Sequence, residues 1–418
     1  MKKIIPILFI ALLLNCFSFS LFAQADAGFI YGKITTFDDE VFEGQIRWGK
    51  EEAYWSDMFN ASKVSNENIE FLSDNELRDL EANKSRRYGW TKKRDNFWDK
   101  WDKEEPEYEY IHQFSCQFGD LKQVNLKRYK RIELTMKDDS KIRVSGDGYN
   151  DIGADIMIYD KDRGRKKIEW DEILVIDFLP NPREFQSVWG APLYGTVKTR
   201  KGIFVGQVQW DKDERIASDV LDGRNREGKH KIEFSEIRAI EKEGDGCLVE
   251  FKNGEDDYLS DSNDVDHGNR GVIVTNPAFG RVVIDWKDFR RVDFTEPTEA
   301  NLMTYNDFQA PLPIKGTIQT KSGQSIYGKI VYDLDESFQY ELLNGEKGRL
   351  QFEIPFRNIQ RIIPARDEST IELKSGSEKL ILEDSQDITQ YNEGILVFDQ
   401  SDKPTYISWR EIKEIVLD

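Results

Sequence analysis

The residues of this chain that could perform chemistry are mostly acids. The sequence of 418 residues holds 78 Asp and Glu but three His and three Cys. So few His and Cys leave little material for a zinc site or a Cys–His dyad. It has no nucleophile-elbow, zinc-protease, dinucleotide-binding or P-loop motif. Paired carboxylates can hydrolyse glycosides, but spacing cannot select a pair among so many acids. We therefore expect no enzyme, no catalytic residue and no cofactor.

An acidic loop recurs three times, with Glu52, Glu214 and Glu336 at matching places. In the first two copies it follows Trp48 and Trp210. Several carboxylate oxygens in one loop could hold Ca²⁺, but this loop lacks the spacing and the glycine of an EF-hand. We interpret it as a solvated hairpin loop and expect no metal site.

A basic, aromatic stretch interrupts the acidic chain. Residues 84–103 carry a local charge of +5 and three tryptophans. Trp, Tyr and Arg dominate the hot spots of protein interfaces. Two interpretations stay open, namely docking on a partner and folding back onto the acidic part of the chain. The candidate binding residues are Arg86, Arg87, Tyr88, Trp90, Trp98 and Trp101.

The first 23 residues have the pattern of an export signal. Lys2 and Lys3 precede an apolar run that ends at Ala23. Cys16 offers a lipoprotein alternative, but Asn15 stands where such signals carry a small residue. No other stretch is apolar enough to span a membrane. We expect a protein that is periplasmic, associated with the outer membrane, or secreted.

Net charge narrows the range of partners. Loss of the two leader lysines takes the net charge from −19 to −21. Such a chain repels a phosphate backbone, so we expect no nucleic-acid partner. Two cysteines remain after the leader: we expect Cys116 to be a core residue, and Cys247 opens a predicted strand. A bridge between them is possible in an exported protein but is not favoured.

Internal repetition with a period of about 120 residues decides the expected architecture. Tyr31-Gly32-Lys-Ile-Thr-Thr runs on to Gly44-Gln-Ile-Arg-Trp48, and the pattern returns from Gly195 and from Gly316. Alternating apolar and polar residues around a turn indicate a β-hairpin. The expected divisions are a signal peptide (1–23), repeat 1 (24–180, with an insertion over about 64–111), repeat 2 (181–295) and repeat 3 (296–418). In the insertion, Ser73 and Glu76 form a capping-box pattern, which predicts a helix from Asp74.

A second motif, apolar-x-aromatic-x-x-apolar-x-x-apolar, recurs six times. Its change from period two to period three indicates a strand followed by a 3₁₀ turn. Two copies per repeat indicate two consecutive halves of small-barrel size, with the aromatic residues in the core. Those residues are Phe118, Trp170, Phe234, Trp286, Phe356 and Trp409.

The Gly-x-Ile-x-Thr…Gly-x-Ile-x-Trp hairpin followed by Ile-x-Phe-x-x-Ile-x-x-Ile resembles PRC-barrel and Sm-like small barrels. The resemblance covers most of residues 29–178, 194–294 and 314–418 except the insertion. It implies an all-β protein of three tandem repeats, each made of two SH3-like barrels. The alternative is a six-bladed β-propeller.

The resemblance also implies binding or assembly rather than catalysis. We therefore expect a non-catalytic, exported binding or scaffolding protein of the bacterial cell envelope. Its expected partner is an envelope protein or a surface glycan. The alternatives are a glycan- or Ca²⁺-binding surface module and, behind both, a hydrolase.

Overall fold

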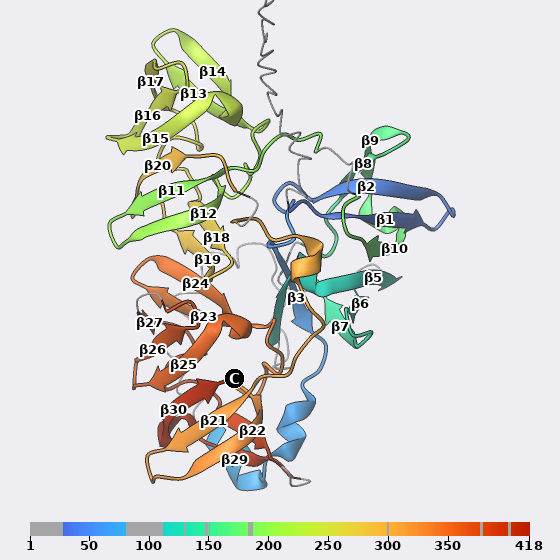
Figure 1. Cartoon of the computed structure of the whole chain (residues 1–418), viewed down its shortest axis with the longest axis vertical. Coiled ribbons are helices and arrows are strands. Elements are labelled where there is room, and N and C mark those ends of the chain that lie inside the picture. Colours follow the sequence, from blue (N-terminus) through green and yellow to red (C-terminus); the bar gives the residue numbers. More distant parts are fainter. Residues whose placement is uncertain are drawn as a thin grey trace, which may run out of the picture.

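The protein is all-β in the part of the chain that the computed structural model describes. Its strands form an antiparallel ten-stranded sheet, an antiparallel eighteen-stranded sheet and a two-stranded ribbon. Figure 1 shows the ten-stranded sheet lying beside a long column of the remaining strands. One helix, over residues 74–80, accompanies them. The described residues are 28–80, 112–128, 131–146, 149, 151–182, 187–298, 301–376, 379–399 and 403–418.

Repeat 1 supplies the ten-stranded sheet, in the order β4-β3-β7-β6-β5-β10-β1-β2-β8-β9. Its strands are β1 (Tyr31–Thr36), β2 (Val41–Trp48), β3 (Met58–Lys63), β4 (His112–Gln117), β5 (Leu121–Arg128), β6 (Arg131–Met136), β7 (Lys141–Ser145), β8 (Ile156–Asp160), β9 (Gly164–Ile168) and β10 (Ile173–Phe178).

Repeat 2 repeats this order with β11 to β20, except that β13 and β14 form the separate ribbon. A single bridge between Arg224 and Ser260 joins that ribbon to β17. The strands are β11 (Tyr194–Thr199), β12 (Ile203–Gln209), β13 (Val220–Asn225), β14 (Gly228–Glu233), β15 (Ile237–Glu243), β16 (Gly246–Phe251), β17 (Asp256–Leu259), β18 (Val272–Asn276), β19 (Gly280–Ile284) and β20 (Phe289–Phe294).

Repeat 3 has the same order again, in β21 to β30. The strands are β21 (Lys315–Thr320), β22 (Ser325–Val331), β23 (Leu342–Lys347), β24 (Leu350–Pro355), β25 (Ile359–Pro364), β26 (Glu368–Leu373), β27 (Leu380–Glu383), β28 (Ile395–Phe398), β29 (Thr405–Ile407) and β30 (Ile412–Leu417).

Each repeat contains two units of five strands, one inserted into the other, although in repeat 2 two strands of the inner unit form the separate ribbon. In repeat 1 the outer unit is β9-β8-β2-β1-β10 and the inner unit is β4-β3-β7-β6-β5, joined where β5 pairs with β10. The prediction of two consecutive halves is therefore wrong. The hairpin β1–β2 pairs with β10 and β8, which come after the whole inner unit. A periodic sequence pattern shows that a strand recurs but not which strand lies beside it.

The ladders of the described residues stay open, and no closed barrel forms among them. The predicted alternative of six separate propeller blades is also wrong, because β5 pairs with β10 and so joins the two units of a repeat into one sheet. The same joint recurs as β15–β20 and β25–β30. The coarse prediction of an all-β repeat protein is confirmed.

The six motif aromatic residues are core residues, as predicted. Their exposed fractions lie between 0% for Phe118 and 6% for Trp286. Five of them begin a 3₁₀ turn, while Trp286 lies in an ordinary turn. The five turns are η3 (Phe118–Asp120), η4 (Trp170–Glu172), η5 (Phe234–Glu236), η8 (Phe356–Asn358) and η9 (Trp409–Glu411).

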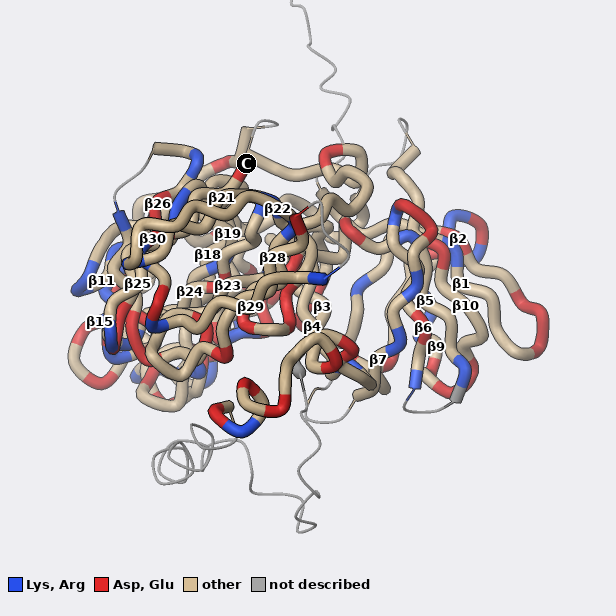
Figure 2. The backbone as a smooth tube through the Cα atoms, turned by 90° about the horizontal axis from the view of Figure 1, so that it is seen from below, with Lys and Arg blue, Asp and Glu red and all other residues tan. Residues whose placement is uncertain are grey.

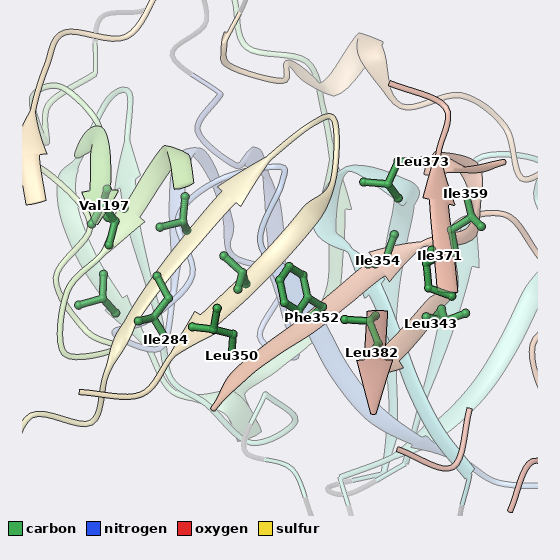
Figure 3. Close-up of a cluster of buried hydrophobic side chains, with 14 of the residues drawn as sticks. Val197, Ile284, Leu343, Leu350, Phe352, Ile354, Ile359, Ile371, Leu373 and Leu382 are labelled. Atoms are coloured by element: carbon green, nitrogen blue, oxygen red, sulfur yellow. The ribbon is translucent and has the colours of Figure 1, made fainter. Parts of the chain in front are cut away.

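Repeats 2 and 3 share one sheet and one hydrophobic core. Edge strand β19 pairs with edge strand β24, with Ile284 opposite Leu350 and Val282 opposite Phe352. Figure 3 shows side chains from both repeats meeting across this joint. Repeat 1 has a largely separate core in its own sheet. Cys116 lies in the core of repeat 1 and Cys247 in the shared core; both are buried and unbridged.

The start of the insertion packs on repeat 3. Ser73 caps the helix over 74–80, with its backbone N–H donating to Glu76 at 2.7 Å, which confirms the predicted capping box. Leu72 and Leu80 lie in one cluster with Leu334 and Leu396 of repeat 3. No helix in the described ranges is long and apolar enough to cross a membrane.

Candidate functional site

The recurring acidic loop is a tight, partly buried turn at the end of β2, β12 and β22. In each copy the aromatic residue and the glutamate four positions later form an antiparallel bridge, as Trp48 does with Glu52. In repeat 2 the turn between them holds Asp211 and Lys212 at φ values of 47° and 64°, a left-handed conformation that costs energy outside glycine. Glu52 is 8% exposed, so the prediction of a solvated loop is wrong.

An aspartate from the segment before β8, β18 or β28 lies beneath each loop. These aspartates are Asp151, Asp264 and Asp387. Their carbonyl oxygens accept from the loop aromatic residue: the Trp48 indole N–H at 2.8 Å, the Trp210 indole N–H at 2.8 Å and the Tyr332 hydroxyl at 2.6 Å.

The side chains of the same aspartates hold a second strand in place. Asp151 Oδ2 accepts the backbone N–H of Asn60 at 2.5 Å. Asp264 and Asp387 do the same for Asp222 and Asn344, both at 2.6 Å. The glutamate, the aspartate and the aromatic residue therefore form one buried unit that occurs in all three repeats.

Burial leaves these carboxyl groups protonated more readily than in water. Loss of solvation raises the pKa of Asp151, Asp264 and Asp387 to about 6. Burial, together with Asp264 and two further carboxylates, raises the pKa of Glu214 to about 9. The same causes raise the pKa of Glu52. Paired carboxyls of this kind could act as acid and base; Asp151 and Asp264 are 4% and 8% exposed, and Glu214 is partly buried.

The geometry of the described acids gives no support to a metal site. No group of three or more His, Cys, Asp or Glu side chains within the described ranges is placed to hold a metal ion. Of the loop acids of repeat 2 that suggested Ca²⁺ from the sequence, Asp211 accepts the backbone N–H of Arg270, whereas Glu214 Oε2 is buried and has no hydrogen-bond partner among the described residues.

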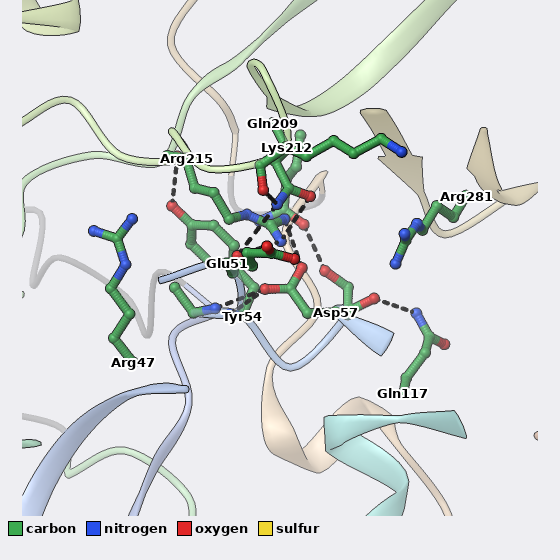
Figure 4. Close-up of polar contacts among 12 residues, drawn as sticks. Arg47, Glu51, Tyr54, Asp57, Gln117, Gln209, Lys212, Arg215 and Arg281 are labelled. Atoms are coloured by element: carbon green, nitrogen blue, oxygen red, sulfur yellow. Dashed lines mark hydrogen bonds and ion pairs between the residues drawn. The ribbon is translucent and has the colours of Figure 1, made fainter. Parts of the chain in front are cut away.

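The loops of repeats 1 and 2 meet at a reciprocal, charge-paired interface. Arg215 of repeat 2 lies 2.5 Å from Asp57 of repeat 1, and the two side chains are 3% and 2% exposed. In return, Arg47 of repeat 1 pairs with Asp219 of repeat 2 at 2.8 Å. Figure 4 shows Arg215 extending over the Tyr54 ring toward Asp57. Asp57 also accepts two backbone N–H groups of its own loop, so its negative charge is stabilised by these donors as well as by Arg215.

Repeat 3 joins the same region through different residues. Lys63 of repeat 1 lies 2.8 Å from Asp335 and 2.6 Å from Glu341. Arg357, at the η8 turn, pairs with Asp120 of the η3 turn at 2.7 Å. These ion pairs therefore tie all three repeats together. We call the region that they form the junction; its pairs are Arg215–Asp57, Lys63–Asp335 and Arg357–Asp120.

The linker between repeats 2 and 3 closes one side of the junction. Its turn η7 (Tyr305–Asp307) lies on η3 of repeat 1, and the Tyr305 ring packs at a tilt against Trp55, with 4.5 Å between the ring centres. Phe308 covers Gly119 so closely that a Cβ there would lie 2.2 Å from the ring. Lys137 donates to the Phe308 carbonyl at 2.7 Å and lies 3.6 Å from the Tyr305 ring centre.

A cavity of about 240 Å³ opens beside this linker. Its walls come from repeat 1 (Gln117, Asp120), from the turn after β18 of repeat 2, from the linker, and from repeat 3 (Gln339, Tyr340). The cavity is thus created by the association of the repeats rather than by any one of them.

The sequence analysis placed the candidate binding site in the insertion and not at the junction. The six predicted binding residues, Arg86, Arg87, Tyr88, Trp90, Trp98 and Trp101, lie outside the described residues, so their role stays a prediction. The junction residues that the sequence analysis missed do carry a signal. Arg215 stands where the other copies have Ala53 and Ser337. A charge present in a single copy marks a contact between repeats.

No family model, no curated protein and no solved structure matches the chain.

Proposed function

We propose that the protein is a non-catalytic binding or scaffolding protein of the bacterial cell envelope. The observation that carries the proposal is the Arg215–Asp57 pair, which is almost completely buried between two repeats. Breaking such a pair is costly, so the repeats act as one rigid frame. A frame with fixed geometry suits a protein that holds partners at set positions.

Strand order supports the finer fold proposal of SH3-like units. The outer unit of repeat 1 runs as the five-stranded series β10-β1-β2-β8-β9, with a tight turn, η4, before β10, and the outer units of repeats 2 and 3 have the same strand order. SH3-like small barrels share a tight turn before a closing strand, and their uses are mainly binding and assembly. This support is an analogy of fold.

The negative net charge supports other proteins or uncharged glycans as the partners of an exported protein. Figure 2 shows acidic and basic residues interspersed along the described backbone. A net charge of −19, or −21 without the leader, disfavours nucleic acid as a partner. We propose export through the signal segment 1–23, with the basic insertion as the first docking element.

Affinity capture from native envelope fractions tests the proposal. Full-length mature chain is compared with a variant that lacks residues 82–111. The deletion spares 64–80, because that segment packs on repeat 3 and its loss would disturb the frame. Capture of the same partner by both chains assigns binding to the repeats, and capture by the full chain alone assigns it to the insertion.

A control keeps the capture experiment interpretable. The variant Trp90→Ala/Trp98→Ala/Trp101→Ala keeps the chain length and removes the aromatic residues alone. If neither the full chain nor any variant retains an envelope component, the binding proposal is overturned. Activity on a panel of esters and glycosides that disappears on changing one carboxylate would contradict the absence of catalysis.

A further inference from the structure

The charged groups that line the cavity at the junction already have partners. Arg357 Nη1 lies 2.7 Å from Asp120 Oδ1, and the Arg357 side chain is 26% exposed. Asp307 Oδ2 accepts the Thr304 backbone N–H at 2.7 Å and the Thr304 hydroxyl at 2.9 Å. The one cation of the lining is therefore paired within the protein, and the lining offers an anionic ligand no unpaired positive charge.

Amide side chains supply most of the remaining polar lining. Asn276, Gln309, Gln339 and Asn358 all face this space. Asn358 donates to the Pro277 carbonyl at 2.9 Å, and Gln309 donates to the Asn306 carbonyl at 3.0 Å. Within the described part of the chain no donor reaches the amide oxygens of Gln309, Gln339 or Asn358. An amide side chain offers both hydrogen-bond donors and acceptors. Adjacent hydroxyl groups of a ligand also donate and accept, so the two are complementary.

Apolar groups form the rest of the wall. The Tyr340 ring stacks on Phe338 with 5.5 Å between centres and 11° between planes. Phe308, Pro311 and Leu312 line the same cavity, and Leu312 is 58% exposed. A few oriented polar groups set among aromatic and aliphatic surface are typical of small-ligand sites, which occur preferentially where domains meet.

We propose that the junction cavity binds an uncharged, polyhydroxylated ligand, namely one sugar residue of a neutral glycan. A sugar ring has hydroxyls for the amides and an apolar C–H face for the aromatic and proline surface. A volume of about 240 Å³ admits one ring, and a longer glycan would continue past Leu312 into solvent. A peptide is less suited, because peptides are usually held on a free strand edge, and the cavity is lined mainly by turns and a linker.

This inference rests on the proposed function, since it gives the binding frame a ligand class. It also goes further, because it adds a ligand site at the junction to the docking element proposed in the insertion. The two can fail separately: a glycan site can be absent while the frame still captures a protein.

The test uses the intact mature chain and named probes. Glucose, galactose and N-acetylglucosamine are titrated at millimolar concentration and followed by saturation-transfer NMR, with glucuronic acid and a proline-rich peptide as charged-sugar and peptide probes. We expect saturable binding of at least one neutral sugar. Gln339→Ala/Asn358→Ala should weaken it roughly tenfold or more, the loss expected for one or two hydrogen bonds.

Two further variants make the result decisive. Gln309→Trp should fill the cavity and abolish binding without removing a charge. Asn253→Ala, which changes an exposed amide in the turn between β16 and β17, should leave binding unchanged. The melting temperature of each variant shows whether it is folded.

Three outcomes would overturn the inference: no neutral sugar gives a saturable signal, binding survives Gln309→Trp, or the peptide or glucuronic acid alone binds. If the envelope partner is still captured by the Gln309→Trp chain in that case, the sugar site fails while the proposed scaffolding function stands.

Discussion

At the scale of single residues, the buried carboxyl groups are the most unusual feature of the protein. Asp264 and Glu214 lie under the loop of repeat 2, and their counterparts occupy the same places in the other repeats. Natural cores seldom bury acids without a cationic partner. All three repeats therefore bear the energetic cost of burying these acids, and all three contain the hydrogen bonds that the aspartates make.

These groups predict an acid-shifted pH optimum for stability. A raised pKa means that the folded state holds the proton more tightly than the unfolded chain does. The resulting stabilisation is complete below the unfolded pKa of about 4 and is lost as pH rises through about 6 for the aspartates. For Glu214 the loss continues toward about 9. We expect the melting temperature to fall steadily from about pH 5 to about pH 9.

Glu214→Gln isolates one contributor. The neutral amide cannot ionise, so this variant should melt a few degrees higher than the native chain in mildly alkaline buffer and equally in mildly acidic buffer. Glu227→Gln, on an exposed residue of the β13–β14 turn, is the matched control and should change neither value. Equal effects of the two variants would show that burial of Glu214 does not govern the pH dependence.

The Arg215–Asp57 pair predicts a large cost when one partner is removed. Arg215→Ala leaves Asp57 buried without its counter-charge, which should lower the free energy of unfolding by about 3 kcal/mol. Lys122→Ala removes an exposed partner of Asp139, and surface pairs contribute about 0–1 kcal/mol. Urea unfolding measures both. A cost below that of Lys122→Ala would mean that the interface does not hold the repeats together.

At the scale of elements, the 3₁₀ turns connect the core to the junction. The backbone N–H of Phe118 donates to the Asp57 carbonyl at 2.9 Å, and Phe234 and Phe356 make the same bond to Asp219 and Glu341 at 3.0 Å. In these three of its six copies, the aromatic motif therefore fixes the segment that follows the acidic loop as well as filling the core.

Gly119→Ala should loosen the linker from the η3 turn. The new methyl group would lie within the volume of the Phe308 ring, and overpacking of this kind typically costs about 1–3 kcal/mol. Adding Phe308→Ala to the same chain should recover part of that loss, because it removes the obstructing ring. Ser235→Ala, at the corresponding turn of repeat 2, is the control for urea unfolding. Destabilisation by Gly119→Ala without any recovery would place the strain somewhere other than Phe308.

Element types could be predicted well from the sequence, but their partners could not. Alternating residues around Gly32 and Gly44 predicted the first hairpin, and the spacing around Phe118 predicted the turn η3. The pairing of β1 with β10 was missed, because it depends on contacts between segments far apart in the chain. Burial of Glu52 was missed for the same reason: composition alone makes a loop of acids look solvated.

At the scale of the whole molecule, the pairing of β19 with β24 predicts that repeats 2 and 3 unfold together. Leu350→Ala at this joint should cost about 2–5 kcal/mol and speed amide hydrogen exchange in both β18–β19 and β23–β24. Leu134→Ala in repeat 1 should speed exchange mainly within β5, β6 and β7. Amide hydrogen exchange measured by mass spectrometry distinguishes the effects of the two variants. Confinement of the Leu350→Ala effect to repeat 3 would show that the shared sheet is not a cooperative unit.

The insertion of one unit within the other also sets the order of events during folding. The strands β1 and β2 are made first, yet their neighbours β8 and β10 are made only after β3 to β7 are complete. In an emerging chain, the apolar β1–β2 hairpin therefore stays without its neighbouring strands until the inner unit has formed. Non-local pairings of this kind slow folding and prolong exposure of sticky strands. The inner unit should thus mature before the outer one in every repeat, and holding chaperones would act on the waiting hairpins.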